Sequence, residues 1–462
     1  MRRLVGFGAG LNYGVHGGGL KNLVRGIVER VLYVRSDEGL GKAPQPVAGV
    51  FDQRLGPFRA SLLRHMRRTP VVPRDEFPLL YNGRKRVVYE RAVDSLTYGA
   101  VSRRDAVVKT FVKAEKINFT KKVDPAPRVI QPRSPRYNVE VGRYLKLFEK
   151  EAIRGFEKRC GYPVILKGLN AVGVAGALRG SWDSFTKPVA VGLDATRFDQ
   201  HVSRAALEWE HSVYNGVFRS GELARLLSWQ LSNHGVGFVD GWKVEYDVEG
   251  CRMSGDMNTG LGNCILMSAM VLSYVESKGI KARLANNGDD CVLMVEKSDL
   301  ASLDQLDGWM LDFGFKLTRE APVDVFERIE FCQAQPVSVG GVWRMVRDPL
   351  TTISKDMVSL HGWANEQEIR YWLHSVGECG AALNAGVPIG GVLYPRLASL
   401  GLPPSAAWVD ASGRSGAWYM ARGLVGAAKA PDDDTRVSYY RAFGILPDLQ
   451  ADIEREAANT TI

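Results

Sequence analysis

The sequence of 462 residues is poor in cysteine, and its cysteines follow no metal-binding or redox pattern. The six cysteines include no C-x-x-C pair, which argues against zinc ribbons and thioredoxin-like sites. Three of them lie in predicted apolar elements, so we expect reduced core thiols in a cytosolic setting. The seven histidines form no H-E-x-x-H motif and no P-loop is present, which excludes two common catalytic signatures.

Long hydrophobic runs are also missing. The best candidate, residues 265–275, is too short to cross a bilayer and is interrupted by Ser268 and Ser273. No signal peptide is apparent. Internal repeats and extended low-complexity tracts are absent as well. These absences predict a globular protein with no direct membrane span.

Positive charge is in excess, with 60 Lys and Arg against 51 Asp and Glu and a net charge of +9. Such a balance suits a polyanion partner, although proteins that merely stay soluble can share it. The distribution is more informative, because residues 103–136 carry only the acids Asp105, Glu115 and Asp124. The basic residues of this stretch are Arg103, Arg104, Lys109, Lys113, Lys116, Lys121, Lys122, Arg128, Arg133 and Arg136.

Gly288, Asp289 and Asp290 stand between two apolar runs within residues 284–295. Asn287 precedes Gly288, and Asn-Gly between β-prone runs predicts a hairpin. Two carboxylates at a hairpin tip can hold Mg²⁺, whereas an isolated match of this kind is equally an ordinary solvated turn.

A second acidic segment, residues 188–199, reads as a buried strand that ends at Asp194 and places Asp199 five residues later. An acid at the end of a core strand can meet the hairpin tip of a neighbouring strand. Three converging carboxylates repel one another unless cations lie between them, so the pattern indicates a divalent-metal site. The alternative is that Asp194 or Asp199 only favours the start of the helix predicted over residues 205–218.

Between these segments, residues 254–267 form a glycine-rich loop that runs into an apolar helix predicted to end at Gly279. Ser254 and Gly255 supply a flexible turn. Thr259 and Asn263 are four residues apart and share one helical face. Capping by Ser254 and satisfied polar groups on the helix would explain any one of these residues, but not the whole set.

In order and spacing, D-x4-D, S-G-x3-T-x3-N and G-D-D resemble the palm motifs of viral RNA-dependent RNA polymerases. The flanking residues are most similar to those of Tombusviridae and umbravirus-like plant viruses, especially Asn286 to Cys291, Met257 to Cys264 and Glu330 to Gln333. The resemblance covers about three quarters of the chain and fades beyond Arg347. Three spaced motifs in the right order are a strong signal, whereas one alone is weak.

The resemblance implies an α+β fold, a closed right-hand polymerase whose antiparallel palm sheet is flanked by helices. We expect fingers over 1–187, including a fingertip extension over 1–34, a palm over 188–337 with a fingers insertion at about 205–250, and a mostly helical thumb over 338–462. A second hairpin, from strand patterns at 329–333 and 342–346, resembles the palm-thumb junction. The glycines at 6–10 match no complete nucleotide-binding fingerprint and read as a flexible loop.

The implied chemistry is template-directed nucleotidyl transfer from NTPs with two Mg²⁺ ions, for which Mn²⁺ can substitute. Asp194 and Asp289 are the expected bridging ligands, with Asp290 in support. Asp199, Thr259 and Asn263 resemble the group that senses the ribose 2′ hydroxyl, with Ser254 and Gly255 in the same nucleotide-binding motif. Lys316 resembles the proton donor to pyrophosphate, although Arg319 nearby is an alternative.

The basic stretch resembles the fingers segment that roofs the NTP channel. On this reading Lys113, Lys116, Lys121 and Arg128 bind the triphosphate, Arg128 having the best match; a solvated basic face that binds RNA backbone is the alternative for each lysine. Lys122 and Arg133 belong to the same stretch. Trp343 is either a stacking surface for initiation or a core aromatic.

The expected partners are the RNA template, nascent RNA and NTPs, but not DNA. In the resembled family the polymerase is often made by readthrough or frameshift from a shorter, membrane-associated replication protein. We therefore expect such an auxiliary partner, a possible N-terminal extension, and a location in membrane-associated replication complexes of the host cytoplasm. Two other functions remain open: an inactive palm scaffold that binds or packages RNA, and a reverse transcriptase, which would more naturally carry a bulky side chain at Asp199.

Overall fold

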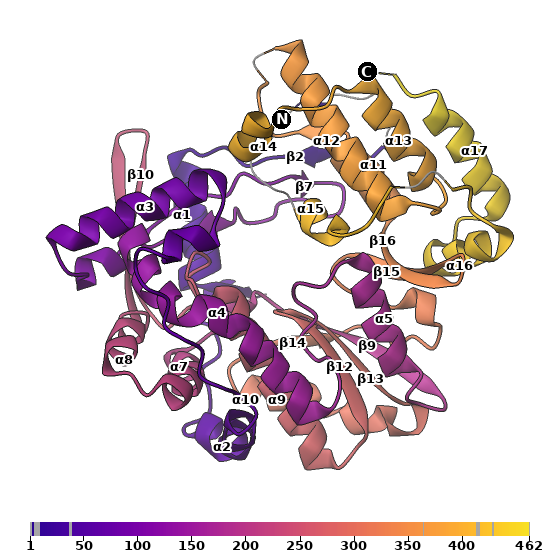
Figure 1. The fold of residues 1–462 in the computed structure, drawn as a ribbon. Helices are drawn as coiled ribbons and strands as arrows, with labels where there is room; N and C mark the ends of the chain where they lie inside the picture. The colour runs from indigo at the N-terminus through magenta and orange to yellow at the C-terminus, as the bar shows by residue number, and fades with distance from the viewer. Residues whose placement is uncertain are drawn as a thin grey trace.

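The computed structural model describes residues 2–3, 10–36, 39–363, 365–412, 416–426 and 429–461. Figure 1 shows the chain running from an indigo N-terminal part, through a magenta and orange centre, to a yellow C-terminal part. The glycine-rich segment singled out above lies outside the described residues except for Gly10.

The centre of the fold is a four-stranded antiparallel sheet in the order β12-β13-β9-β14. The two middle strands are the ones expected from the acidic motifs. The bounds are β9 Pro188–Ala195, β12 Ala282–Asn287, β13 Asp290–Glu296 and β14 Leu317–Arg319. Both the strand ending near Asp194 and the hairpin carrying Asp289 and Asp290 are thereby confirmed.

Both faces of this sheet are buried, which explains why its strands read as nearly continuous apolar runs. Along β13, Leu293 and Val295 belong to the largest core cluster, whereas Val292 and Met294 belong to a second cluster on the opposite face. Side chains alternate between faces along a strand, so each face has its own cover.

The largest core is built around α9, Thr259–Lys278, whose residues from Leu261 to Val275 are all buried. Its C-cap, Gly279, has a φ of +64°, so the predicted helix stop is confirmed. The helices that pack with it in this core include α2 Val50–Leu63, α4 Pro135–Cys160, α7 Arg204–Phe218 and α10 Leu306–Asp312. The second core lies on the other face and is covered by α5, Ala171–Trp182.

The remaining elements before β9 are short strands and helices that surround the basic stretch. Their bounds are β1 Arg2–Arg3, β2 Tyr13–Gly14, α1 Leu20–Ile27, a π-helical turn Val28–Leu32, β3 Val34–Ser36, β4 Gly39–Gly41, α3 Gly83–Tyr98, β5 Val108–Lys109, β6 Phe111–Val112, β7 Ile117–Asn118 and β8 Val129–Ile130, with 3₁₀ turns at Phe77–Leu80 and Arg103–Ala106.

After β9 the chain makes α6 Phe198–His201 and then returns to this first region. It forms α8 Gly221–Ser228 and the hairpin of β10 Ser232–Val239 and β11 Trp242–Glu249. β10 pairs in parallel with β5, so residues 232–249 join the N-terminal part of the molecule. The fingers insertion expected at about 205–250 stays a prediction.

The C-terminal region is mostly helical and has its own core, made of residues between Val337 and Ala457. It begins with the hairpin β15 Ala334–Val339 and β16 Val342–Arg347. The other elements are α11 Pro349–Asp356, β17 Val358–Ser359, α12 Glu366–Asn384, α13 Gly390–Leu400, α14 Ala406–Ser412, α15 Gly416–Ala421, α16 Asp433–Phe443 and α17 Pro447–Ala458.

Contacts between the two ends of the chain join the N-terminal and C-terminal regions (Figure 1). β1 pairs antiparallel with β17, and the Lys116 ammonium donates to the Lys355 carbonyl over 2.8 Å. These contacts connect segments that the sequence separates by more than two hundred residues.

Two local predictions were wrong. The strand expected at 329–333 begins only at Ala334, because Cys332 and Gln333 form a turn with φ of +53° and +60°. The amphipathic pattern of Leu300, Leu303 and Leu306 predicts one helix capped by Ser298, but the segment is split into the 3₁₀ segment Lys297–Leu303 and α10, and its N-cap is Glu296. In both cases tertiary packing overrides the local pattern. Within the described ranges, no helix is both long and apolar enough to cross a membrane.

Leu293→Ala tests the importance of the sheet's larger core. Leu293 is fully buried, so we expect a loss of about 2–5 kcal/mol in the free energy of unfolding, measured from the midpoint of urea denaturation. Leu311, which is 50% exposed, supplies the control, and its replacement by Ala should cost much less. Equal losses would contradict the assignment of Leu293 to the core.

Candidate active site

The motif residues gather around a cavity of about 1070 Å³ at the end of β9 and the tip of the β12–β13 hairpin. Its lining has two chemical characters, acidic and basic. The carboxylates are Glu29, Asp124, Asp194, Asp199, Asp289, Asp290, Glu320 and Glu330, and the cations are Arg30, Arg35, Lys122, Arg128, Arg197 and Arg252.

Asp194 and Asp290 lie directly opposite each other in the antiparallel register of β9 and β13. Asp289 occupies the hairpin loop beside them, since Asn287 pairs with Asp290 and leaves Gly288 and Asp289 as the two loop residues. Gly288 has a φ of +98°, which matches a two-residue loop with glycine in its first position. The three aspartates predicted to act together therefore line one cavity.

The hairpin tip is fixed by Asn286, which is fully buried. Its side-chain oxygen accepts from the Gly288 N–H over 3.1 Å, and its amide donates to the Gly288 carbonyl over 2.8 Å. Both bonds bend the backbone around Gly288 and hold Asp289 at the cavity. The Asn-Asn-Gly sequence therefore provides the turn and the side chain that supports it.

The pKa of Asp290 is raised, first by burial among the protein atoms of the cavity and then by the charges of Asp289 and Asp194. The Cys332 backbone N–H opposes this rise by hydrogen bonding to the carboxylate. That N–H is positioned by the turn in which Phe331 and Ala334 exchange backbone hydrogen bonds of 2.9 and 3.1 Å. Two non-glycine residues with positive φ thus stand next to the acids, and such strain costs of order 1–3 kcal/mol each.

Asp199 lines the cavity and is bound by Asn263. The Asn263 amide donates to Asp199 Oδ1 over 2.7 Å. Burial raises the pKa of Asp199, while the Asn263 bond and the charge of Arg252 act in the opposite direction. The carboxylate and amide pair expected from the sequence is therefore brought together.

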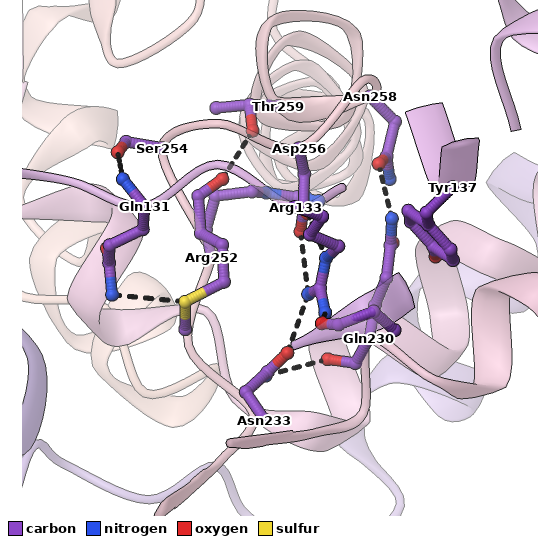
Figure 2. A network of polar contacts seen from close by, with 12 residues as sticks. Gln131, Arg133, Tyr137, Gln230, Asn233, Arg252, Ser254, Asp256, Asn258 and Thr259 are labelled. Atoms are coloured by element: carbon purple, nitrogen blue, oxygen red, sulfur yellow. Dashed lines mark hydrogen bonds and ion pairs between the residues drawn. The ribbon is translucent and has the colours of Figure 1, made fainter. Parts of the chain in front are cut away.

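The other residues of that motif have structural contacts. The Thr259 hydroxyl donates to the Met253 carbonyl over 2.7 Å, as Figure 2 shows. Ser254 does not cap α9 but joins the loop to the basic stretch, accepting from the Gln131 N–H and donating to the Val129 carbonyl. Gly255 lies so close to Pro132 that a Cβ would stand 2.5 Å from its Cα. Glycine is needed here for this close approach.

Among the basic residues predicted to bind a triphosphate, Arg128 lines the cavity. Lys113 pairs with Glu115 over 2.9 Å, Lys116 donates to the Lys355 carbonyl as described, and Lys121 lines a neighbouring cavity of about 510 Å³. Arg133, assigned to the same basic stretch, is instead buried and ion-paired to Asp256 (Figure 2). Lys316 is exposed outside the cavity lining, and its carbonyl accepts from the Thr196 N–H. Trp343 packs against Phe326, with ring centroids 4.7 Å apart.

Sequence reasoning missed Arg30, Arg197, Glu320 and Glu330 as cavity residues. Arg197 lies within the D-x4-D spacing, which was a usable signal. Burial, followed by the charges of Arg197 and Arg128, lowers the pKa of Arg30 to about 10. Together with Arg35, Lys122 and Arg128, Arg30 and Arg197 supply cationic side chains to the cavity lining.

The aspartates suit a hard divalent cation in donor type, because they offer only carboxylate oxygens. The raised pKa of Asp290 indicates negative charge that the surrounding protein does not offset. Across the described ranges, however, no group of three or more His, Cys, Asp or Glu side chains is already arranged to hold a metal ion.

Comparisons with known proteins agree with one another. A family model described as viral RNA dependent RNA polymerase matches residues 1–462. The chain is 46% identical over 457 residues to the RNA-directed RNA polymerase of turnip crinkle virus, covering 98% of this chain and 58% of that protein. It is similarly 46% identical over 454 residues to the enzyme of tobacco necrosis virus (strain A), covering 98% of this chain and 63% of the relative.

A further relative is the RNA-directed RNA polymerase of melon necrotic spot virus, which is 46% identical over 465 residues. That match covers 99% of this chain and 58% of the relative. The chain thus spans roughly three fifths of the length of the curated relatives it matches.

Asp290→Asn tests whether the charge of the Asp290 carboxylate destabilises the fold. The test does not depend on any reaction. A carboxyl whose folded pKa is raised destabilises the fold once the pH exceeds its ordinary range, so we expect a higher Tm for the variant at neutral pH in EDTA. This gain in Tm should disappear as the pH falls to about 4 and below, where the Asp290 carboxyl of the unfolded chain is protonated as well.

The exposed Asp75 gives the matched control, and Asp75→Asn should leave Tm nearly unchanged at all pH values. A lower Tm for Asp290→Asn at neutral pH would contradict the conflict inferred at the cavity.

Proposed function

This chain belongs to the viral RNA-dependent RNA polymerases, and from that premise we propose that it copies an RNA template from NTPs to replicate a positive-strand RNA virus genome. The observation that carries the proposal is the convergence of Asp194, Asp289 and Asp290 on one cavity, with two of them opposed in the sheet register. Neither an RNA-packaging scaffold nor a structural protein has a use for such an arrangement.

Membership of the family implies the right-hand polymerase fold. We propose the finer division into fingers over 1–187, palm over 188–337 with the insertion at about 205–250, and thumb over 338–462. The separate core of the C-terminal helices supports a thumb. The strand β15 extends across the proposed boundary between palm and thumb. The pairing of β1 with β17 and the contact of Lys116 with Lys355 support a closed hand.

Two Mg²⁺ ions, when bound, would lower the pKa of the attacking 3′ hydroxyl, neutralise the α-phosphate and stabilise the leaving pyrophosphate. Asp194 and Asp289 are the proposed bridging ligands and Asp290 the supporting one. Asp194 at the end of β9 and Asp289 in the hairpin loop line one cavity, which supports this assignment. Mn²⁺ has the same donor preferences and is the expected substitute.

The cationic side chains of the cavity lining suit the triphosphate. Arg128 is the predicted one, and Arg30, Arg197 and Lys122 line the same cavity. Guanidinium groups bind phosphate oxygens with two N–H donors at once and remain charged throughout. Lys113, Lys116 and Lys121 are better placed for the RNA backbone or the fingers-thumb contact, and Lys316 stays the predicted proton donor.

Asp199 and Asn263 suit recognition of ribose. A 2′ hydroxyl can donate to the carboxylate and accept from the amide, whereas a deoxyribose makes neither of these bonds. This favours NTPs over dNTPs and disfavours a reverse transcriptase.

The proposed partners are template and product RNA, NTPs and a membrane-associated auxiliary replication protein of the virus. The corresponding location is the replication complexes on membranes of the host cytoplasm. The basic balance of the chain supports an RNA partner. Incorporation of labelled NTPs on a short RNA template, with and without Mg²⁺, tests the central activity; no incorporation by folded protein under either condition would refute it.

Asp289→Asn should abolish synthesis and leave RNA binding intact, because the amide keeps the shape of the side chain but not its anionic oxygens. Product yield and RNA affinity are measured together. Asp75→Asn is again the control and should keep wild-type activity. Normal incorporation by the folded Asp289 variant would refute the metal assignment.

Sugar choice should depend on Asp199 and Asn263. Replacing Asn263 by Ala should lower the ratio of kcat/KM for GTP to that for dGTP by about 10-fold or more, because the 2′ hydroxyl loses a partner. Replacing Asp199 by Ala should act in the same direction. An unchanged ratio, even with reduced activity, would assign both residues to structure alone.

The closed hand should allow synthesis to start without a primer, because two nucleotides must be held without the binding energy of a duplex. We expect a full-length product with a 5′ triphosphate from a 3′-blocked template and NTPs alone. Product that forms only when a primer is added contradicts this expectation.

The role of the pairing between β1 and β17 is tested by deleting residues 1–10, which include β1 and end before β2. The buried Leu23, Ile27 and Val31 stay in place, so the nearby core is retained. Loss of unprimed product with primed extension retained would support the enclosing role, whereas equal unprimed synthesis would exclude it.

A further inference from the structure

A completely buried ion pair lies behind the proposed ribose-binding residues. The Arg252 guanidinium binds the Glu210 carboxylate, and both side chains have no exposed surface. Glu210 also accepts from the Tyr214 hydroxyl over 2.7 Å and from the Asn258 amide over 2.8 Å. The carboxylate is therefore held by three donor groups from different parts of the chain.

Such a pair is not explained by stability alone. Desolvation of two charges is expensive, and well-packed apolar residues in their place are often neutral or stabilising. The pair also constrains its neighbour Gly262, because a Cβ there would collide with both Glu210 and Arg252. The local sequence of α9 is thus adapted to keep two charges inside the core.

Arg252 contacts both residues proposed to sense the sugar. Its backbone N–H donates to the Asp199 carbonyl over 2.8 Å. Its side-chain Nε donates to the Asn263 Oδ1 atom over 3.1 Å. One residue therefore fixes the turn that carries Asp199 and the side chain of Asn263.

The second contact determines which way the Asn263 amide faces. A guanidinium has only donors, so its partner on Asn263 must be the oxygen. The Asn263 nitrogen is then directed to Asp199, as the bond of 2.7 Å requires. One of its two N–H groups binds Asp199, and the planarity of the amide then fixes the direction of the other.

We propose that Arg252, held by Glu210, is a positioning residue for ribose selection: it orients the Asn263 amide so that an N–H and the Asp199 carboxylate together face the 2′ hydroxyl. This inference rests on the proposed function, since it concerns the sugar of the NTP. Arg252 itself acts through Asn263 and Asp199 and needs no contact with the nucleotide.

The buried pair of Arg252 and Glu210 is part of a larger polar network. Asn258, which donates to Glu210, accepts from the Gln230 amide over 2.9 Å. Figure 2 shows this bond beside Asn233, which connects Gln230 to the second buried pair, Arg133 and Asp256. The orientation of Asn263 is thus tied to the fingers and not only to its own helix.

Arg252→Lys is the sharpest test. Lysine keeps the charge beside Glu210, but its compact ammonium cannot present one donor to Asn263 and a separate fork to Glu210 as arginine does. We expect kcat/KM for GTP to fall about 10- to 100-fold while the value for dGTP changes much less, which lowers the ratio.

Two further variants serve as controls for this result. Tyr214→Phe removes a donor to Glu210 without touching Asn263, so it should lower Tm and leave the GTP to dGTP ratio unchanged. The double variant Arg252→Lys with Asn263→Ala should have the same ratio as Asn263→Ala alone, because the proposal routes the effect through Asn263.

The outcomes separate this inference from the function on which it rests. A wild-type protein that incorporates neither nucleotide refutes the proposed function. An active, discriminating wild type with an unchanged ratio in Arg252→Lys, or with equal loss for GTP and dGTP, overturns the positioning role.

If Arg252→Lys does not fold, Glu210→Leu combined with Arg252→Met removes both charges and is the replacement least costly to the core. Its Tm establishes folding. A lowered ratio then supports the positioning role, and a wild-type ratio overturns it.

Discussion

The register between β9 and β13 is the constraint on which the rest of the site depends. Pairing of Asp194 with Asp290 places two carboxylates side by side at one end of a buried sheet. Because side chains alternate along a strand, a slip of either strand by one residue would turn its acid toward the opposite core and separate the two carboxylates. The two apolar clusters on the faces of the sheet prevent such a shift, so ordinary core packing fixes the position of the acids.

The polar side chains around the acids are held in place by buried hydrogen bonds rather than by many surface ion pairs. Asn286 shapes the hairpin from within, while Arg252 and Arg133 each join several backbone segments. Each of these groups loses water on folding and therefore needs every partner it has. The result is a cavity lined by acids and cations and supported by these buried contacts.

Much of this could be predicted from the sequence, because it depends on local signals. The β12–β13 hairpin follows from Asn-Gly between apolar runs, and the end of α9 follows from Gly279. The turn at Cys332 and Gln333 could not be foreseen, since non-glycine residues with positive φ have no clear sequence signal. Arg133 was misread for a different reason: Asp256, its partner, is 123 residues away. Arg30 and Glu320 reach the cavity only through tertiary folding, which periodicity does not encode.

The pairing of β1 with β17 can form only late in the synthesis of the chain. Arg3 lies opposite Val358, so roughly 350 residues must be synthesised before the first strand has its partner, which takes about 20–70 s at the usual rates of translation. Closing so large a loop is entropically unfavourable, and such long-range contacts slow folding. The central sheet, complete once β14 is made, can assemble earlier. A ribosome-bound chain would thus pass through a stage in which the acidic end of the sheet exists and the enclosing contact does not.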